Sequence, residues 1–174
     1  AQTYFAVQTR RQEVADEQAA TIDRVEQRER LKQATKDLNS AAKTSGVQNY
    51  ALFHDAGYKG LYGMGLAGIK TRKKLGAKDD LFDRAGRSEL AANFFRATQA
   101  AERLEREKVR GEQAAKETHH KVGAEVRATI KKLGNTVPEN LPAEPDIKVI
   151  KKQLSAKKTL ILKLDRSDES NAES

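Results

Sequence analysis

The hydrophobic and polar positions of the first 45 residues follow the pattern of a long helix. Only in the last part of this helix do the apolar residues gather on one face. The segment contains no proline or glycine and is dominated by Ala, Gln, Glu, Arg, Lys and Asp, mostly good helix formers. Residues 3–43 therefore predict one long helix, or two that break near Asp16, ending at Gly46. Apolar residues gather on one face from Leu31 to Leu38. We interpret these two leucines as a candidate oligomerisation seam, an apolar face that we expect another chain to cover.

The clearest helical pattern lies between residues 88 and 134. Ser88 is a suitable N-cap for a helix whose apolar positions step by four, three, four and three: Leu90, Phe94, Ala97, Ala101 and Leu104. After Gly111 a second helix carries the same rhythm and ends at Gly134, with Pro138 beyond it: Ala115, His119, Val122, Val126, Ile130 and Leu133. The short link predicts an antiparallel hairpin whose two stripes face each other, with Gly123 permitting close approach.

Between these parts the chain is rich in glycine and tyrosine. Residues 47–53 predict a short helix, and five glycines from Gly57 to Gly68, interleaved with Tyr58, Leu61, Tyr62 and Leu66, predict a structured turn region. A short basic helix over residues 66–75 and another near residues 80–84 follow. The fold class is therefore all-α, with a long N-terminal helix, a Gly/Tyr-rich turn region with short helices, and an antiparallel helical hairpin.

Three prolines between residues 138 and 145 mark an extended segment after the hairpin. Residues 146–154 predict a last helix, residues 159–164 either strand or helix, and the acidic, serine-rich end from Ser167 a disordered tail. We divide the chain into a long helix (1–45), a helical core domain (46–137) and an extension with a short basic helix and an acidic tail (138–174). Because the sequence starts inside a helix and without Met, we expect an N-terminal domain to precede it.

Composition narrows the functional classes. The 174 residues include 33 Lys and Arg against 25 Asp and Glu, a net charge of +8 that favours polyanionic partners, although helices also carry such charges simply as solvated faces. The absence of cysteine excludes disulfides, zinc fingers, iron–sulfur clusters and thiol catalysis. No apolar run is long enough for a membrane span and no signal sequence is visible, so we expect no membrane partner. We expect a cytoplasmic protein, and association with the nucleoid is compatible with this location.

Catalytic and cofactor motifs are weak. Residues 63–68 (GMGLAG) match the glycine spacing of dinucleotide-binding loops, but no strand precedes them, so we interpret them as a Gly-rich turn. His119 and His120 are neighbours on a helix and point about 100° apart, which suits a core histidine better than a metal pair. No nucleophile elbow or carboxylate pair stands out. We therefore predict no enzyme, no cofactor, no metal and no small-molecule substrate.

Basic residues beside aromatic residues are the remaining signal. A positively charged groove with stackable rings is a common way to hold single-stranded nucleic acid. Two runs are candidates, the first beside two tyrosines: Tyr58, Tyr62, Lys70, Arg72, Lys73, Lys74, and then Lys148, Lys151, Lys152. The alternative for each run is a solvated face, and the tyrosines are equally interpretable as buried anchors.

Several stretches of the sequence resemble the DNA-damage-inducible protein D family: residues 2–13 (QTYFAVQTRRQE), 57–63 (GYKGLYG), 88–99 (SELAANFFRATQ), 120–127 (HKVGAEVR), then Gly134 and 138–142 (PENLP). The resemblance covers residues 2 to about 145. It implies a bacterial or phage-borne protein that is induced by DNA damage in the SOS response, has no known catalytic residues, and follows an N-terminal domain similar to Bro-type phage antirepressors.

Two hypotheses follow from the resemblance together with the basic runs. In the first, the chain is a non-enzymatic accessory module of DNA repair that binds single-stranded DNA, or a recombinase filament formed on it. In the second, it is a protein–protein or homo-oligomerisation module of an antirepressor-like regulator, and the N-terminal domain makes the DNA contact.

Overall fold

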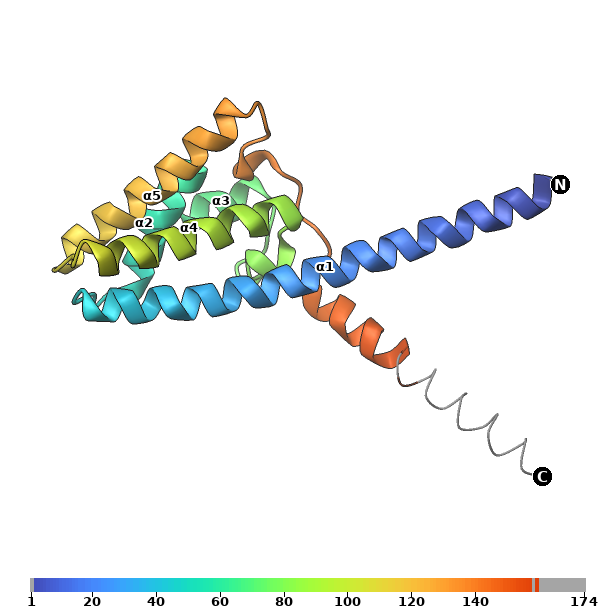
Figure 1. Cartoon of the computed structure of the whole chain (residues 1–174), viewed down its shortest axis with the longest axis horizontal. Coiled ribbons are helices and arrows are strands. Elements are labelled where there is room, and N and C mark those ends of the chain that lie inside the picture. The colour runs from blue at the N-terminus through green and yellow to red at the C-terminus, as the bar shows by residue number, and fades with distance from the viewer. Residues whose placement is uncertain (1, 158, 160–174) are drawn as a thin grey trace, which may run out of the picture. The chain divides into compact units, whose positions relative to one another are not determined.

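The computed structural model describes residues 2–157 and residue 159, and these contain helices, turns and loops but no strand (Figure 1), which confirms the all-α class. Contacts divide the chain into two units, residues 1–144 and residues 145–174, and each is described by itself. The elements of the first unit are α1 (Gln2–Thr44), α2 (Tyr50–Tyr62), α3 (Leu66–Arg72), the 3-10 turn η1 (Phe82–Arg84), α4 (Arg87–Arg106), α5 (Glu112–Lys132) and the 3-10 turn η2 (Pro138–Asn140).

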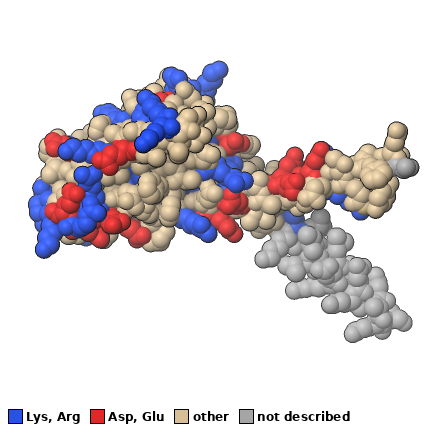
Figure 2. Space-filling model, turned by 45° about the horizontal axis from the view of Figure 1, so that its top comes forward, with Lys and Arg blue, Asp and Glu red and all other residues tan. Residues whose placement is uncertain are grey.

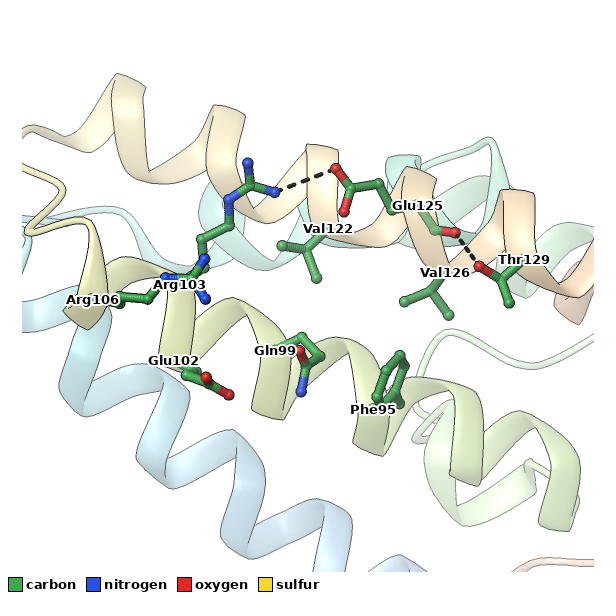
Figure 3. Close-up of a pocket in the computed structure, with 9 residues that line it drawn as sticks. All are labelled: Phe95, Gln99, Glu102, Arg103, Arg106, Val122, Glu125, Val126 and Thr129. Carbon is green, nitrogen blue, oxygen red and sulfur yellow. Dashed lines mark hydrogen bonds and ion pairs between the residues drawn. The ribbon is translucent and has the colours of Figure 1, made fainter.

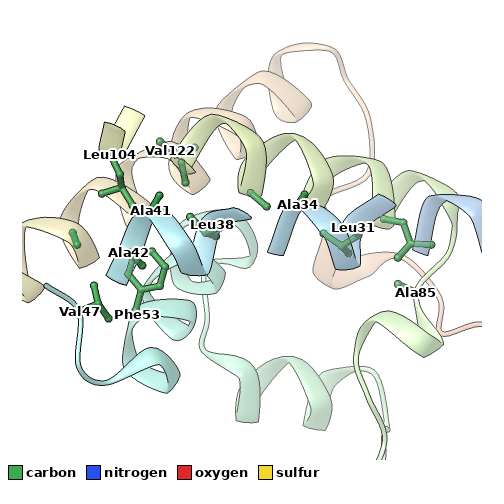
Figure 4. Packing of buried hydrophobic residues seen from close by; sticks show 14 residues of the cluster. Leu31, Ala34, Leu38, Ala41, Ala42, Val47, Phe53, Ala85, Leu104 and Val122 are labelled. Carbon is green, nitrogen blue, oxygen red and sulfur yellow. The ribbon is translucent and has the colours of Figure 1, made fainter. Parts of the chain in front are cut away.

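Helix α1 is the predicted long helix, and it runs through Asp16 without a break. Its C-terminal half packs along α4 (Figure 1). Leu31 and Leu38 have no exposed surface, because they lie in a core cluster with residues of α2, α4 and α5 (Figure 4). The chain's own helices therefore cover Leu31 and Leu38, and the prediction of an oligomerisation seam there is wrong. The periodicity of α1 shows that a face is apolar but not whether the same chain or another one covers it.

Three of the five glycines of the expected turn region lie inside helices instead, and only Gly63 and Gly65 lie in a turn, between α2 and α3. Helix α2 continues through Gly57 and Gly60 to Tyr62, and only Gly63, with φ of 71°, ends it. A Cβ atom on Gly60 would lie 2.2 Å from the carbonyl oxygen of His120, and one on Gly123 would lie 2.6 Å from that of Gly57. These glycines therefore let α2 and α5 approach backbone to backbone. Gly123 serves contact with α2, whereas the sequence pattern assigned it to the hairpin.

Helices α4 and α5 follow each other along the chain as an antiparallel pair, and both apolar stripes contribute to the core. Helix α4 begins at Arg87 with Gly86 as its N-cap, so Ser88 lies within the first turn and does not cap the helix. The link between the two helices is tied to the end of α1, because the amide of Gly111 donates a hydrogen bond of 2.8 Å to the carbonyl oxygen of Ser45.

In the second unit, residues 147–157 form the predicted last helix. The strand or helix expected over residues 159–164 and the expected tail from Ser167 lie outside the described residues, apart from Thr159.

Candidate nucleic-acid interface

The first basic run is distributed over α3 and the turn that follows it, and its members point to different neighbours. Lys70 donates a hydrogen bond of 3.0 Å to the carbonyl oxygen of Ala77, and Arg72 donates through Nε to Asn140 Oδ1 at 3.1 Å. Lys74 adopts a left-handed backbone conformation, with φ of 56°, and its side chain is exposed. Lys73 is buried. The run therefore offers three cations to solvent instead of four.

These cations line two separate hollows. Tyr58 and Lys70 line a groove of about 750 Å³ between α2 and α3, whose walls include Leu52, Leu66 and Leu75. Arg72 and Lys74 line a second hollow of about 410 Å³ that extends to the residues after η2. The structure thus brings one predicted tyrosine and one predicted lysine together in one groove, whereas the two exposed cations, Arg72 at the end of α3 and Lys74 in the turn after it, line the second hollow.

Tyr58 is held firmly at the side of the groove. The centre of the Arg96 guanidinium lies 5.1 Å from the centroid of its ring, and the ring of Phe82 approaches it edge-on at 6.0 Å. Burial raises the pKa of the Tyr58 phenol above its usual value of 10, while the positive charge of Arg96 opposes that rise. The phenol is therefore neutral at physiological pH and forms part of an aromatic cluster behind the groove.

Tyr62 and Lys73 do not reach the surface, which corrects their selection as nucleic-acid contacts. The Tyr62 hydroxyl donates to Glu89 Oε1 at 2.8 Å and accepts from Asn93 Nδ2 at 2.7 Å. Lys73 Nζ donates to Glu89 Oε2 at 2.9 Å and to the carbonyl oxygen of Leu141 at 2.7 Å. A buried carboxylate needs such partners, because removing it from water is costly. Glu89, which the sequence pattern did not single out, is the centre of this arrangement.

The same polar chain continues to α5. Asn93 Oδ1 accepts hydrogen bonds from Nε and Nη2 of Arg96 at 3.2 and 3.1 Å, and Nη1 of Arg96 meets His119 Nε2. His119 Nδ1 lies 2.9 Å from the carbonyl oxygen of Phe53. Since Arg96 can only donate, His119 accepts at Nε2 and donates at Nδ1, which assigns a neutral imidazole. His119 is thus a fully buried core histidine with both nitrogens satisfied, as the sequence predicted.

One buried and one half-buried imidazole, His119 and His54, make the stability of the fold dependent on pH. Burial and the charge of Arg96 hold the pKa of His119 well below 6.5, and the same two causes lower the pKa of His54 to about 4. Unfolded histidines titrate near 6.5, so the unfolded chain takes up protons first as pH falls. The stabilisation is therefore fully present above about pH 6.5 and is lost below it, for His54 down to about pH 4.

We predict that the free energy of unfolding falls by about 2.5 kcal/mol between pH 7.5 and pH 5.5, about half from each histidine. Urea denaturation at each pH measures it. His54→Gln removes one of the two groups, so the fall should shrink to about half in that variant. A flat profile between the two pH values would contradict the assignment of both histidines as neutral in the folded chain.

A third groove opens between α4 and α5, and none of the residues predicted to bind nucleic acid lines it. Phe95 on α4 and Val122 and Val126 on α5 line it, and Arg103 bridges it to Glu125 at 3.3 Å (Figure 3). On the face that Figure 2 shows, positive and negative side chains are interspersed. Among the described residues no group of three or more His, Asp or Glu side chains could hold a metal ion, and no helix is long and apolar enough to cross a membrane.

The second basic run belongs to the other unit. Lys148, Lys151 and Lys152 lie on the helix of residues 147–157, where Lys148 and Lys152 are exposed and Lys151 is half-buried. The amide of Lys148 donates to Asp146 Oδ1 at 2.8 Å, which caps the start of this helix.

Comparison with known proteins agrees with the sequence resemblance. The family model of the DinD C-terminal domain matches residues 16–151. DNA damage-inducible protein D of Escherichia coli (strain K12) is 44% identical over 167 residues, which cover 91% of this chain and 61% of that protein. The chain therefore spans about 61% of the length of this relative.

Proposed function

The chain belongs to the DinD C-terminal domain family, and from this premise we propose that it is a non-enzymatic helical module of the DNA-damage response that binds single-stranded DNA, or a recombinase filament formed on it, and thereby modulates repair. The name of the Escherichia coli relative supports the link to DNA damage. The structure supports a place for the contact.

The observation that carries the proposal is the groove between α2 and α3. Tyr58 and Lys70 line it together, with Leu52 and Leu66 in its walls, so that it combines an aromatic edge, apolar surface and a cation. Sequence-tolerant binding of single strands uses this combination, in which bases pack on rings and apolar surface while cations follow the phosphates.

Two more exposed cations follow Lys70 along the chain. Arg72 and Lys74 lie beyond Lys70 toward η2. Successive phosphates of a single strand are several ångströms apart. Three separated cations therefore suit a phosphate backbone better than they suit one isolated anion. Lys73 has no part in this contact, because its ammonium is buried against Glu89.

We predict that reversing these three charges weakens nucleic-acid binding without unfolding the chain. The variant Lys70→Glu, Arg72→Glu, Lys74→Glu should lower the affinity for a labelled single-stranded oligonucleotide at least tenfold at low salt and reduce the slope of log affinity against log salt by about 2. Fluorescence anisotropy across a salt series measures both. A second titration uses the oligonucleotide precoated with recombinase.

The matched control reverses three exposed lysines of α5, namely Lys121, Lys131 and Lys132, and so makes the same change in net charge. It should retain most of the binding, because none of these lysines lines either hollow. Equal loss in both variants would reduce the effect to net charge alone. If neither the bare nor the coated oligonucleotide binds the unaltered chain, the proposal fails in favour of the protein–protein module.

A further inference from the structure

Helix α1 has a second apolar stripe, on the side opposite to the one that enters the core. With about 100° per residue, five residues fall within an arc of about 80°: Tyr4, Val7, Val14, Ile22 and Val25. The core-facing residues Leu31 and Leu38 lie roughly 180° away on the same helix. The stripe from Tyr4 to Val25 therefore cannot be a continuation of the face that packs on α4.

Exposure supports this geometry. Tyr4, Val7, Val14 and Ile22 are between 38% and 66% exposed, and every residue from 2 to 19 is exposed. Beyond Val25 the same side of α1 continues with charged, exposed residues: Glu29, Lys32 and Lys36. The side is thus apolar up to Val25, which is half-buried, and over the residues before it that the chain leaves exposed.

The spacing along the stripe is that of a coiled-coil seam. With Arg11 and Gln18 included, its positions step by three, four, three, four, four and three, from Tyr4 to Val25. A solvated helix of about 20 residues is marginally stable by itself, so an apolar seam of this length is best satisfied by a second helix. Phe5 lies outside the seam.

The seam is symmetric about its middle, and this property identifies its partner. Tyr4 and Val25, Val7 and Ile22, and Arg11 and Gln18 are each placed at equal distances from a centre between residues 14 and 15. A second copy laid antiparallel therefore aligns apolar positions with apolar ones and places each Arg11 opposite a Gln18, whose side-chain oxygen accepts its hydrogen bonds.

Charges beside the seam agree with the same register. Arg10 and Glu17 both flank the stripe on one side, and in the antiparallel arrangement Arg10 of one copy lies about two residues along the axis from Glu17 of the other. The symmetry forms this pair twice. Polar positions within an apolar seam also fix its register, which here is the role of Arg11 and Gln18.

We propose that this chain forms an antiparallel homodimer through residues 4–25 of α1, with the two compact helical bodies held at opposite ends of the shared seam. This places the self-association surface on the side of α1 opposite to Leu31 and Leu38. It is independent of nucleic-acid binding, which uses α2 and α3.

Oligomeric mass tests the dimer. Sedimentation velocity over a concentration series is expected to give about twice the 19.3 kDa of one chain at the higher concentrations. The variant Val7→Glu, Ile22→Glu should raise the dissociation constant at least about a hundredfold, because each change acts twice in the symmetric seam. Thr9→Glu, exposed on the opposite side of the same segment, is the control and should still dimerise. All these variants should keep the thermal stability of the core.

Disulfide trapping tests the antiparallel register. Because the chain has no cysteine, no native thiol can compete with the introduced ones. Val7→Cys chains mixed with Ile22→Cys chains should form a disulfide-linked pair under mild oxidation, whereas each alone should not. Val14→Cys should link to itself. A monomer at all concentrations, a dimer that Val7→Glu, Ile22→Glu leaves intact, or self-linkage of Val7→Cys overturns the proposal.

Discussion

Replacing Gly60 by alanine is expected to destabilise the fold by about 3 kcal/mol or more, one of the two largest effects that we predict. The added methyl group would lie 2.2 Å from the carbonyl oxygen of His120 and 2.9 Å from the amide nitrogen of Ala124, both backbone atoms of α5. A backbone cannot rotate out of the way as a side chain can, so α2 and α5 would have to separate along their whole contact. Urea denaturation of Gly60→Ala against the unaltered chain measures the loss.

Gly68 provides the matched control, because it is also a helical glycine. A Cβ atom there would meet only the flexible side chain of Met64, at 3.4 Å or more. Gly68→Ala is expected to change stability by less than about 1 kcal/mol, and in the stabilising direction, since alanine favours helix more than glycine does. If Gly60→Ala were as mild as Gly68→Ala, the close approach of α2 and α5 would be disproved.

The same glycines show where prediction from sequence reached its limit. Periodicity located the long helix and most positions of both stripes of α4 and α5, because a helix that buries one face repeats that face every three or four residues. Phe94 and Leu133, which the pattern also assigned to the stripes, are exposed. A glycine has no such signature. In a turn it supplies an unusual φ, and in a helix it removes a Cβ from a contact, and both roles produce the same letters in the sequence. The role of Gly60 depends on His120, which lies sixty residues away.

The basic run illustrates a second limit. Lys70, Arg72, Lys73 and Lys74 count equally toward net charge, but the structure exposes Arg72 and Lys74, half-buries Lys70 and buries Lys73 against Glu89. One signal was available, because Lys73 follows the fully buried Ile69 by four residues and therefore lies on the same side of the helix. The acid that receives its charge belongs to another helix, and no local pattern pairs the two.

The buried pair leads to the other large effect: Lys73→Met is expected to lower the free energy of unfolding by about 3 to 5 kcal/mol at pH 7.5. Methionine keeps the aliphatic stem, but Glu89 then remains in the core without its ammonium partner. Burial raises the pKa of Glu89, and the Lys73 and Tyr62 contacts oppose that rise. Without Lys73 the folded chain should hold a proton on Glu89 up to a higher pH, so the loss should be smaller at pH 5 than at pH 7.5.

Two further variants separate loss of the pair from loss of packing. Glu89→Gln in the Lys73→Met background removes the uncompensated charge while its side-chain oxygen still accepts from Tyr62, so it should restore much of the lost stability. Lys74→Met changes the adjacent, exposed lysine and should cost less than about 0.5 kcal/mol. Denaturation of all three at both pH values is the measurement. If the double variant were as unstable as Lys73→Met and the deficit did not vary with pH, the loss would come from packing and not from a buried carboxylate that depends on Lys73.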